Sequence, residues 1–185
     1  IQNHSLEEEH FRGERFVDHP AILKGNNDLL SITQPKIIKE IHRNYFDAGA
    51  DIIETNTFSS TSIGMADYQM ESLAYELNYE SAKIAKEVSE EYLEKTPHQP
   101  RYVAGSIGPT NKTASMSPDV NDPGYRAISF DELVTAYKEQ VNGLVDGGSD
   151  LLLVETIFDT LNAKAALYAI NEIKEERGID IPIMV

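Results

Sequence analysis

The sequence predicts an α/β fold in which parallel strands are covered by helices. Short apolar segments alternate with amphipathic helical segments along the chain, and glycine follows most of the helical segments. The clearest strand, residues 150–156, is apolar without alternation, which is typical of a strand covered on both faces. Polar residues follow the strands directly, and this placement favours a barrel over a doubly wound sheet.

The first long helix is expected to begin at Pro35, with Thr33 as its N-cap and Gly49 as its left-handed stop. A strand follows at residues 51–55. A second long helix is expected from about Met70 to Lys95.

A strand at residues 101–106 leads into a polar, proline-containing loop that ends near Ala127. The pattern of a capping box at Ser129 and Glu132 starts the next helix, which stops at Gly147 and Gly148.

The last helix is expected from about Asn162 to Arg177, with Asp159 as its N-cap. One more strand begins at Ile181. Residues 48–55 resemble residues 147–156, because both run from a helix end through a strand to Glu-Thr, so one βα unit is repeated.

Only about four strands can be counted, whereas a closed eight-stranded barrel typically needs ~250 residues. The prediction is therefore a partial TIM (β/α)8 barrel. We expect residues 1–185 to be one domain that lacks the first strand and the C-terminal half of the barrel.

The composition limits the function classes. The 185 residues carry a net charge of -15, which argues against a nucleic-acid partner. No apolar run approaches the ~20 residues of a membrane span, so no membrane partner is expected and the cytoplasm is the default location. There are no cysteines, and none of the five histidines is spaced as a metal ligand. We expect every histidine, including His42, to be a solvated surface group.

Glu155 is the strongest candidate for a binding residue. A carboxylate at the end of a buried strand is costly unless a cation meets it, and an amino-acid ammonium group is a suitable partner. A salt bridge to a neighbouring lysine or arginine, or simple exposure, would satisfy the pattern equally well.

A second polar cluster ends the strand at residues 51–55. Glu54, Thr55 and Asn56 could hold a carboxylate or an amine, and Thr55 is the best placed because it follows the strand immediately. Loop capping is an equally good account of Asn56 and Thr57. No residue is assigned a catalytic role, and none is assigned to a metal.

Several long runs resemble the homocysteine-binding domain of cobalamin-dependent methionine synthase, and they occur in the same order. The runs are FRGERF (11–16), KGNNDLL (24–30), AGADIIETNTF (48–58), MADYQME (65–71), GPTNKT (108–113), SPDV (117–120) and ETIFDTLNAK (155–164).

The resemblance implies an enzyme that makes methionine from homocysteine and methyltetrahydrofolate through cobalamin, with a zinc-activated thiolate. Glu155 matches the glutamate that binds the homocysteine amino group, and Thr55 matches a substrate-side threonine of the related betaine-dependent enzymes. Folate, cobalamin and reactivation modules of the same polypeptide are the implied partners.

The chain departs from this family in the chemistry of the thiol site. The family binds zinc through cysteines, which are expected on later strands, and this chain has none. We therefore expect the chain alone to hold neither zinc nor cobalamin and to be inactive. Two alternatives stay open: a betaine-type homocysteine methyltransferase, and a non-catalytic binding module derived from a barrel.

Overall fold

A single parallel sheet organises the chain. The structure is a computed structural model that describes Ile1 and residues 3–185. The strands are β1 (Ile52–Glu54), β2 (Tyr102–Ile107), β3 (Leu151–Val154) and β4 (Ile183–Met184), and they lie side by side in chain order. This arrangement confirms the predicted α/β fold and is that of one part of a TIM-barrel wall.

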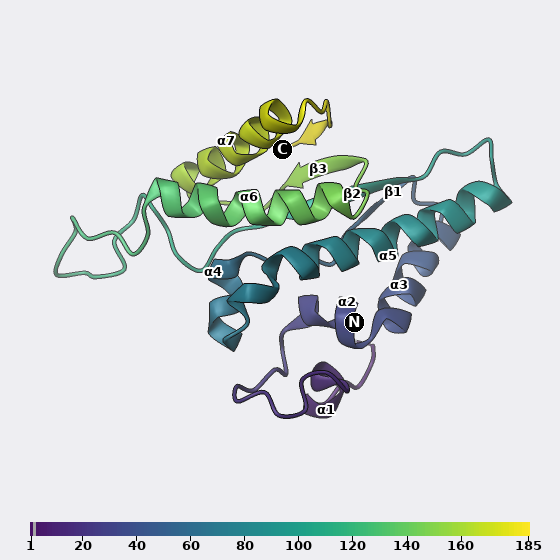
Figure 1. Ribbon diagram of the computed structural model, residues 1–185, viewed down its shortest axis with the longest axis horizontal. Coiled ribbons are helices and arrows are strands. Elements are labelled where there is room, and N and C mark those ends of the chain that lie inside the picture. Colours follow the sequence, from purple (N-terminus) through teal and green to yellow (C-terminus); the bar gives the residue numbers. More distant parts are fainter. Residues whose placement is uncertain (2) are drawn as a thin grey trace.

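Four long helices cover one face of this sheet. In chain order α3, α5, α6 and α7 pack against one another in succession, and each contacts the strands beneath it (Figure 1). The helices are α1 (Glu8–Arg12), α2 (Leu30–Thr33), α3 (Pro35–Asp47), α4 (Ser62–Met65), α5 (Ala74–Lys95), α6 (Phe130–Asp146) and α7 (Thr160–Arg177). Short 3-10 turns lie at Asn27–Leu29, Ala66–Tyr68 and Glu71–Leu73. Among the described residues, none of the helices combines the length and apolarity needed to cross a membrane.

Most helix boundaries follow the predictions, but the start of the second long helix is a correction. α5 begins at Ala74 and not near Met70, because residues 71–73 form a separate 3-10 turn before it.

The N-cap of α3 is a second correction. Thr33 is not the N-cap of α3, because it lies in the short preceding helix α2 and donates its Oγ1 hydrogen to the Leu29 carbonyl. Gln34 takes the N-cap position. The capping box of α6 is confirmed: the Glu132 N–H donates to Ser129 Oγ at 3.2 Å, and the Ser129 N–H donates to Glu132 Oε2 at 2.8 Å.

The two faces of the sheet differ in burial. Ile53, Val103 and Leu152 point into the helical layer and are at most 4% exposed. On the opposite face Ile52, Tyr102 and Met184 are 41%, 46% and 44% exposed. We call this second surface the open face. The sheet therefore joins the core through the face that the helices cover, and no described segment covers the apolar side chains of the open face.

His42 corrects the expectation that every histidine is solvated. It is buried on α3, on the same helix face as Ile38 and Phe46, which are also buried. Burial without a charged partner lowers the pKa of the imidazole to about 4. Its Nε2 atom has no hydrogen-bond partner among the described residues.

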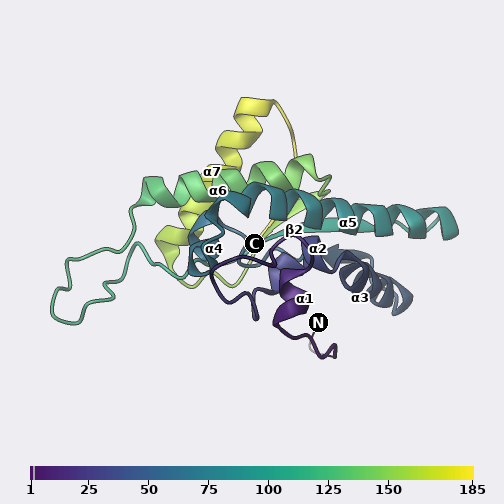
Figure 2. The ribbon, with the colours of Figure 1, turned by 60° about the horizontal axis from the view of Figure 1, so that its bottom comes forward.

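The long loop between β2 and α6 projects away from the helices (Figure 2). Its first part is tied to the start of α7. Asp159 caps α7, as predicted, by accepting from the Leu161 and Asn162 N–H groups, and it also accepts from the Ser115 N–H at 3.0 Å. Asn162 accepts from the Ala114 N–H at 3.0 Å, so both residues join the loop to the helix.

Gly143 allows α5 and α6 to approach closely, and we expect Gly143→Ala to lower the free energy of unfolding by about 1–2 kcal/mol. A Cβ there would lie 2.6 Å from the Tyr75 carbonyl oxygen and 2.8 Å from Asn78 Cβ. Since the first of these is a backbone atom, the helices would have to separate. Urea unfolding measures the change, and Gly124→Ala, in the projecting loop, is the control with little effect. An unchanged Gly143→Ala variant would contradict this account.

Candidate functional site

The carboxyl ends of β1, β2 and β3 bring the predicted polar residues to one edge of the sheet. Glu155 follows β3 directly and is half-buried. Ser106 of β2 donates its hydroxyl hydrogen to Glu155 Oε1 at 2.6 Å. This bond fixes one carboxylate oxygen, and no lysine or arginine pairs with Glu155 among the described ion pairs. The Glu155 carboxylate is therefore oriented by the sheet and carries a negative charge that no described cation neutralises.

Glu54 lies on the same face of the sheet as Glu155. Partial burial and the nearby negative charge of Glu155 both raise the pKa of the Glu54 carboxyl group. A cation that enters between the two carboxylates would meet both charges. The geometry thus brings together two of the predicted residues, from strands β1 and β3.

Thr55 is buried, and its hydroxyl group already has partners within the protein. Thr55 Oγ1 accepts from the Ser106 N–H at 3.0 Å and lies 2.6 Å from Thr57 Oγ1. Thr57 Oγ1 in turn donates to the Ser106 carbonyl at 2.7 Å. These bonds join the end of β1 to the end of β2 and position Ser106. The predicted contact of Thr55 with a ligand stays a prediction.

Asn56 turns towards the N-terminal segment. Its Nδ2 group donates to the Asn27 carbonyl at 2.8 Å and to Ser31 Oγ at 3.2 Å. The side chain therefore holds the KGNNDLL segment against the end of β1. Its predicted role in ligand binding also stays a prediction.

Gln140 belongs to the same network, and the sequence reading missed it. The side chain is fully buried on α6, and its Nε2 group donates to the Thr57 carbonyl at 2.9 Å. The sequence did contain a signal for Gln140: it is a polar residue on the apolar side of the predicted helix, one turn after Tyr137 and next to Val141. The contact of Ser106 with Glu155 was not predicted, because the sequence indicates only that Ser106 ends a strand.

The backbone is strained directly after Glu155. Thr156 has a φ of 57°, a left-handed conformation that is rare for a β-branched residue and costs roughly 1–2 kcal/mol. The strained turn carries the chain away from the sheet immediately after the carboxylate. Such strain is often found at functional sites, and it supports a functional reading of Glu155.

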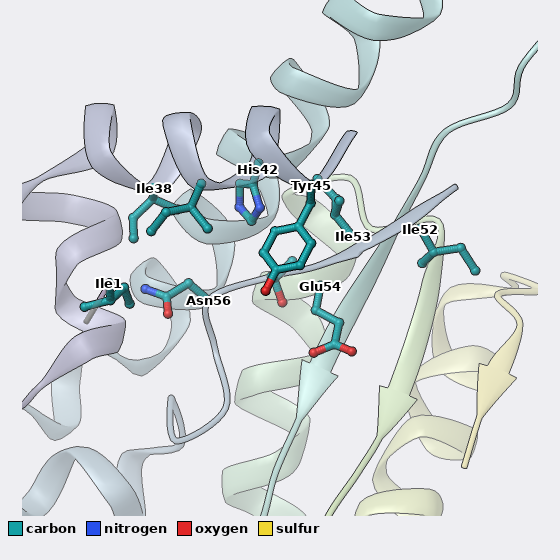
Figure 3. Close-up of a pocket in the computed structure, with 10 residues that line it drawn as sticks. Ile1, Ile38, His42, Tyr45, Ile52, Ile53, Glu54 and Asn56 are labelled. Carbon is teal, nitrogen blue, oxygen red and sulfur yellow. The ribbon is translucent and has the colours of Figure 1, made fainter. Parts of the chain in front are cut away.

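Two pockets lie beside these residues. The first has a volume of about 300 Å³ and is lined by α3 and by residues 52–56 (Figure 3). The second, of about 380 Å³, includes Asn56, Asp28 and Asp67 in its wall.

Asp28 holds the loop after β1. One carboxylate oxygen accepts from the Ser59 N–H at 2.7 Å and from Ser60 Oγ at 2.8 Å. Burial raises the pKa of the carboxyl group to about 6, although both hydrogen bonds oppose the shift.

The described residues offer no metal site. Among Ile1 and residues 3–185, no group of three histidine, cysteine, aspartate or glutamate side chains could hold a metal ion. The chain has no cysteine to supply a thiolate ligand.

The fold and the site together define a part of a parallel α/β barrel whose polar groups gather at the carboxyl ends of the strands. Over residues 1–185 the sequence matches the model of the homocysteine S-methyltransferase family. The chain belongs to this family.

Solved structures of the homocysteine methyltransferase MmuM from Escherichia coli are similar to this chain. The oxidised form has a TM-score of 0.63 and 26% sequence identity, over 77% of this chain and 49% of MmuM. The metallated form has the same TM-score and identity, over 80% and 50%. The apo form has a TM-score of 0.60 and 25% identity, over 80% and 49%. The chain thus spans about half the length of these relatives.

Proposed function

We propose that this chain is the homocysteine-binding part of a methyltransferase of the cobalamin-dependent methionine synthase type. The observation that carries the proposal is the Glu155 carboxylate, which Ser106 orients and no described cation neutralises. Membership of the homocysteine S-methyltransferase family supports homocysteine as the substrate. The run from Gly25 to Pro35 and the SPDV run favour the cobalamin-dependent type over the betaine-type alternative.

In this proposal Glu155 accepts hydrogen bonds from the α-ammonium group of homocysteine. Glu54 adds a second negative charge on the same face of the sheet and strengthens the attraction. Thr55 and Asn56 border the substrate, and their hydrogen bonds hold the loop between β1 and α4 in place. These contacts orient the amino acid. None of the four residues takes part in forming the bond between the homocysteine sulfur and the methyl group.

Zinc is the metal that the proposed enzyme type uses to make the homocysteine thiol a thiolate. The residues described here do not fit such a centre, since they include no cysteine and no cluster of three suitable ligands. We therefore derive no step through zinc, and we assign no cobalamin contact to this chain. Folate, cobalamin and reactivation modules of the same polypeptide are the proposed partners, in the cytoplasm.

The principal alternative is a homocysteine methyltransferase with a different donor, such as betaine. The similarity to MmuM favours it as the second candidate. The two candidates share the amino-acid site around Glu155 and differ only in the source of the methyl group.

The decisive experiment supplies homocysteine and different methyl donors to the complete gene product that contains these residues. Methyl transfer from methylcobalamin or methyltetrahydrofolate, but not from betaine or S-methylmethionine, is the expected result. Transfer from betaine or S-methylmethionine without cobalamin would support the alternative. If no donor gives methionine while homocysteine still binds, the domain is a non-catalytic binding module.

A further inference from the structure

The register of β1 with β2 stops before it reaches Ser106. Its last pair is Glu54 with Ala104, and the next residue, Thr55, donates its N–H to the Ala104 carbonyl at 2.9 Å. Ser106, which orients Glu155, lies two residues further along β2. The bonds that hold its peptide groups on the side of β1 therefore come from side chains.

Two threonine hydroxyls close a ring of hydrogen bonds around Ser106. The Ser106 N–H donates to Thr55 Oγ1 at 3.0 Å, and Thr57 Oγ1 donates to the Ser106 carbonyl at 2.7 Å. Because the Thr57 hydroxyl hydrogen is used in this way, Thr55 is the donor in the 2.6 Å bond between the two hydroxyls. All three bonds run in the same direction round the ring, an arrangement in which hydrogen bonds strengthen one another.

Gln140 holds this ring from the helical layer. Its side chain is fully buried on α6, and Nε2 donates to the Thr57 carbonyl at 2.9 Å and to the Ser106 carbonyl at 3.4 Å. Both neighbours are acceptors, so the NH₂ group of the amide, and not Oε1, must face them. Oε1 is left buried without a hydrogen-bond partner among the described residues.

The two carbonyls that Gln140 meets have other partners. The Thr57 carbonyl also accepts from the Ser60 N–H at 3.1 Å, and the Ser106 carbonyl accepts from Thr57 Oγ1. The unpaired Oε1 atom, by contrast, lowers stability, because a buried acceptor without a partner loses its hydration. An apolar side chain of the same length would leave none of these groups unpaired, so stability alone does not explain a glutamine at this position.

We propose that Gln140 is a positioning residue for the amino-acid site, a role that rests on the proposed function. By holding the Thr57 and Ser106 carbonyls together, it keeps the Ser106 hydroxyl where it donates to Glu155 Oε1 at 2.6 Å. Glu155 then presents its other carboxylate oxygen to the ammonium group of homocysteine. Gln140 touches no substrate atom, yet it sets the preference of the enzyme for thiols that carry an amino group.

Gln140→Met in the complete gene product tests this role, since methionine has nearly the length of glutamine but no hydrogen-bond donor. The measurement is the ratio of kcat/KM for homocysteine to kcat/KM for 4-mercaptobutyrate, an analogue without the amino group. The ratio should fall roughly fivefold, the factor that corresponds to the loss of one hydrogen bond. The fall should come from a higher KM for homocysteine with little change in kcat. In urea unfolding, the variant should be at least as stable as the wild type.

Gln99→Met is the matched control. The Gln99 amide also donates a hydrogen bond, to the Asp51 carboxylate at 3.1 Å, but it does so just before β1, at the end of the sheet opposite to Glu155. This variant should leave the ratio unchanged. In an enzyme that already carries Glu155→Gln, Gln140→Met should cause no further fall in the ratio, because both changes act through the same carboxylate.

Three results would overturn the role of Gln140. If Glu155→Gln lowers the ratio and Gln140→Met does not, Gln140 has no part in positioning and the proposed function stands. If Gln140→Met lowers activity equally with both thiols, or no longer folds, the glutamine has a structural role only. If Glu155→Gln itself leaves the ratio unchanged, the carboxylate does not bind the ammonium group, and the proposed function fails together with the role of Gln140.

Discussion

In the methyltransferase that we propose, Glu155→Gln is expected to raise the KM for homocysteine by about 30-fold, with little change in kcat. The variant keeps the size of the side chain and the bond from Ser106, but it removes the charge that is proposed to pair with the ammonium group of homocysteine. Loss of one partner of a partly buried ion pair costs about 2 kcal/mol, which corresponds to that factor. The contact is the same in the ground state and the transition state, so the effect falls on KM.

Steady-state kinetics with homocysteine and with 4-mercaptobutyrate, which lacks the amino group, measures this effect. The variant should discriminate much less between the two thiols than the wild type does. Glu94→Gln, at an exposed position on α5, is the control and should leave KM unchanged. If Glu155→Gln lowered activity equally with both thiol substrates, the carboxylate would have a structural role and would not bind the ammonium group.

Asp28→Asn is expected to become more stable relative to the wild type as the pH rises from 4 to above 6. The pKa of the Asp28 carboxyl group is about 6 in the folded chain, against 3.8 for an unperturbed aspartate. The folded state therefore binds more protons in this range, and the wild type loses stability as the pH rises through it. The shift corresponds to about 3 kcal/mol, since each pKa unit is worth about 1.4 kcal/mol.

Urea unfolding of both proteins at a series of pH values provides the comparison. Asparagine can still accept from the Ser59 N–H and Ser60 Oγ, so the two proteins should have similar stability below pH 4. Asp18→Asn, at an exposed position, controls for the change in net charge. A stability difference between Asp28→Asn and wild type that stays constant with pH would contradict the account.

The order of strands and helices could be predicted because local signals agree with the fold. Asp159 and the pair Ser129 and Glu132 cap helices where the sequence predicts, and the apolar run at β3 lies in the sheet. Thr33 was assigned wrongly because the hydrogen bonds of α2, a single helical turn, depend on packing as well as on residue preference. Local propensity does not reveal such a turn.

The arrangement of the candidate site was predictable only in part. Glu155 and Glu54 follow from the strand pattern, because parallel strands place their carboxyl ends at one edge. Gln140 and Ser106 depend on which strand lies beside which helix, and no local pattern contains that information. His42 was predicted to be solvated and is buried. The sequence around it does not show whether another part of the chain covers the face of the helix that carries it.

The loop between β2 and α6 is anchored at both ends, and the length of the chain between these anchors can vary. Asp159 and Asn162 hold the loop at Ala114 and Ser115, and Ser129 anchors its other end at the start of α6. Between these anchors the chain can change length at the modest entropic cost of a longer loop, about 0.6 kcal/mol for each doubling. Residues 121–127 can thus be lengthened or shortened without rebuilding the sheet edge that holds Glu155.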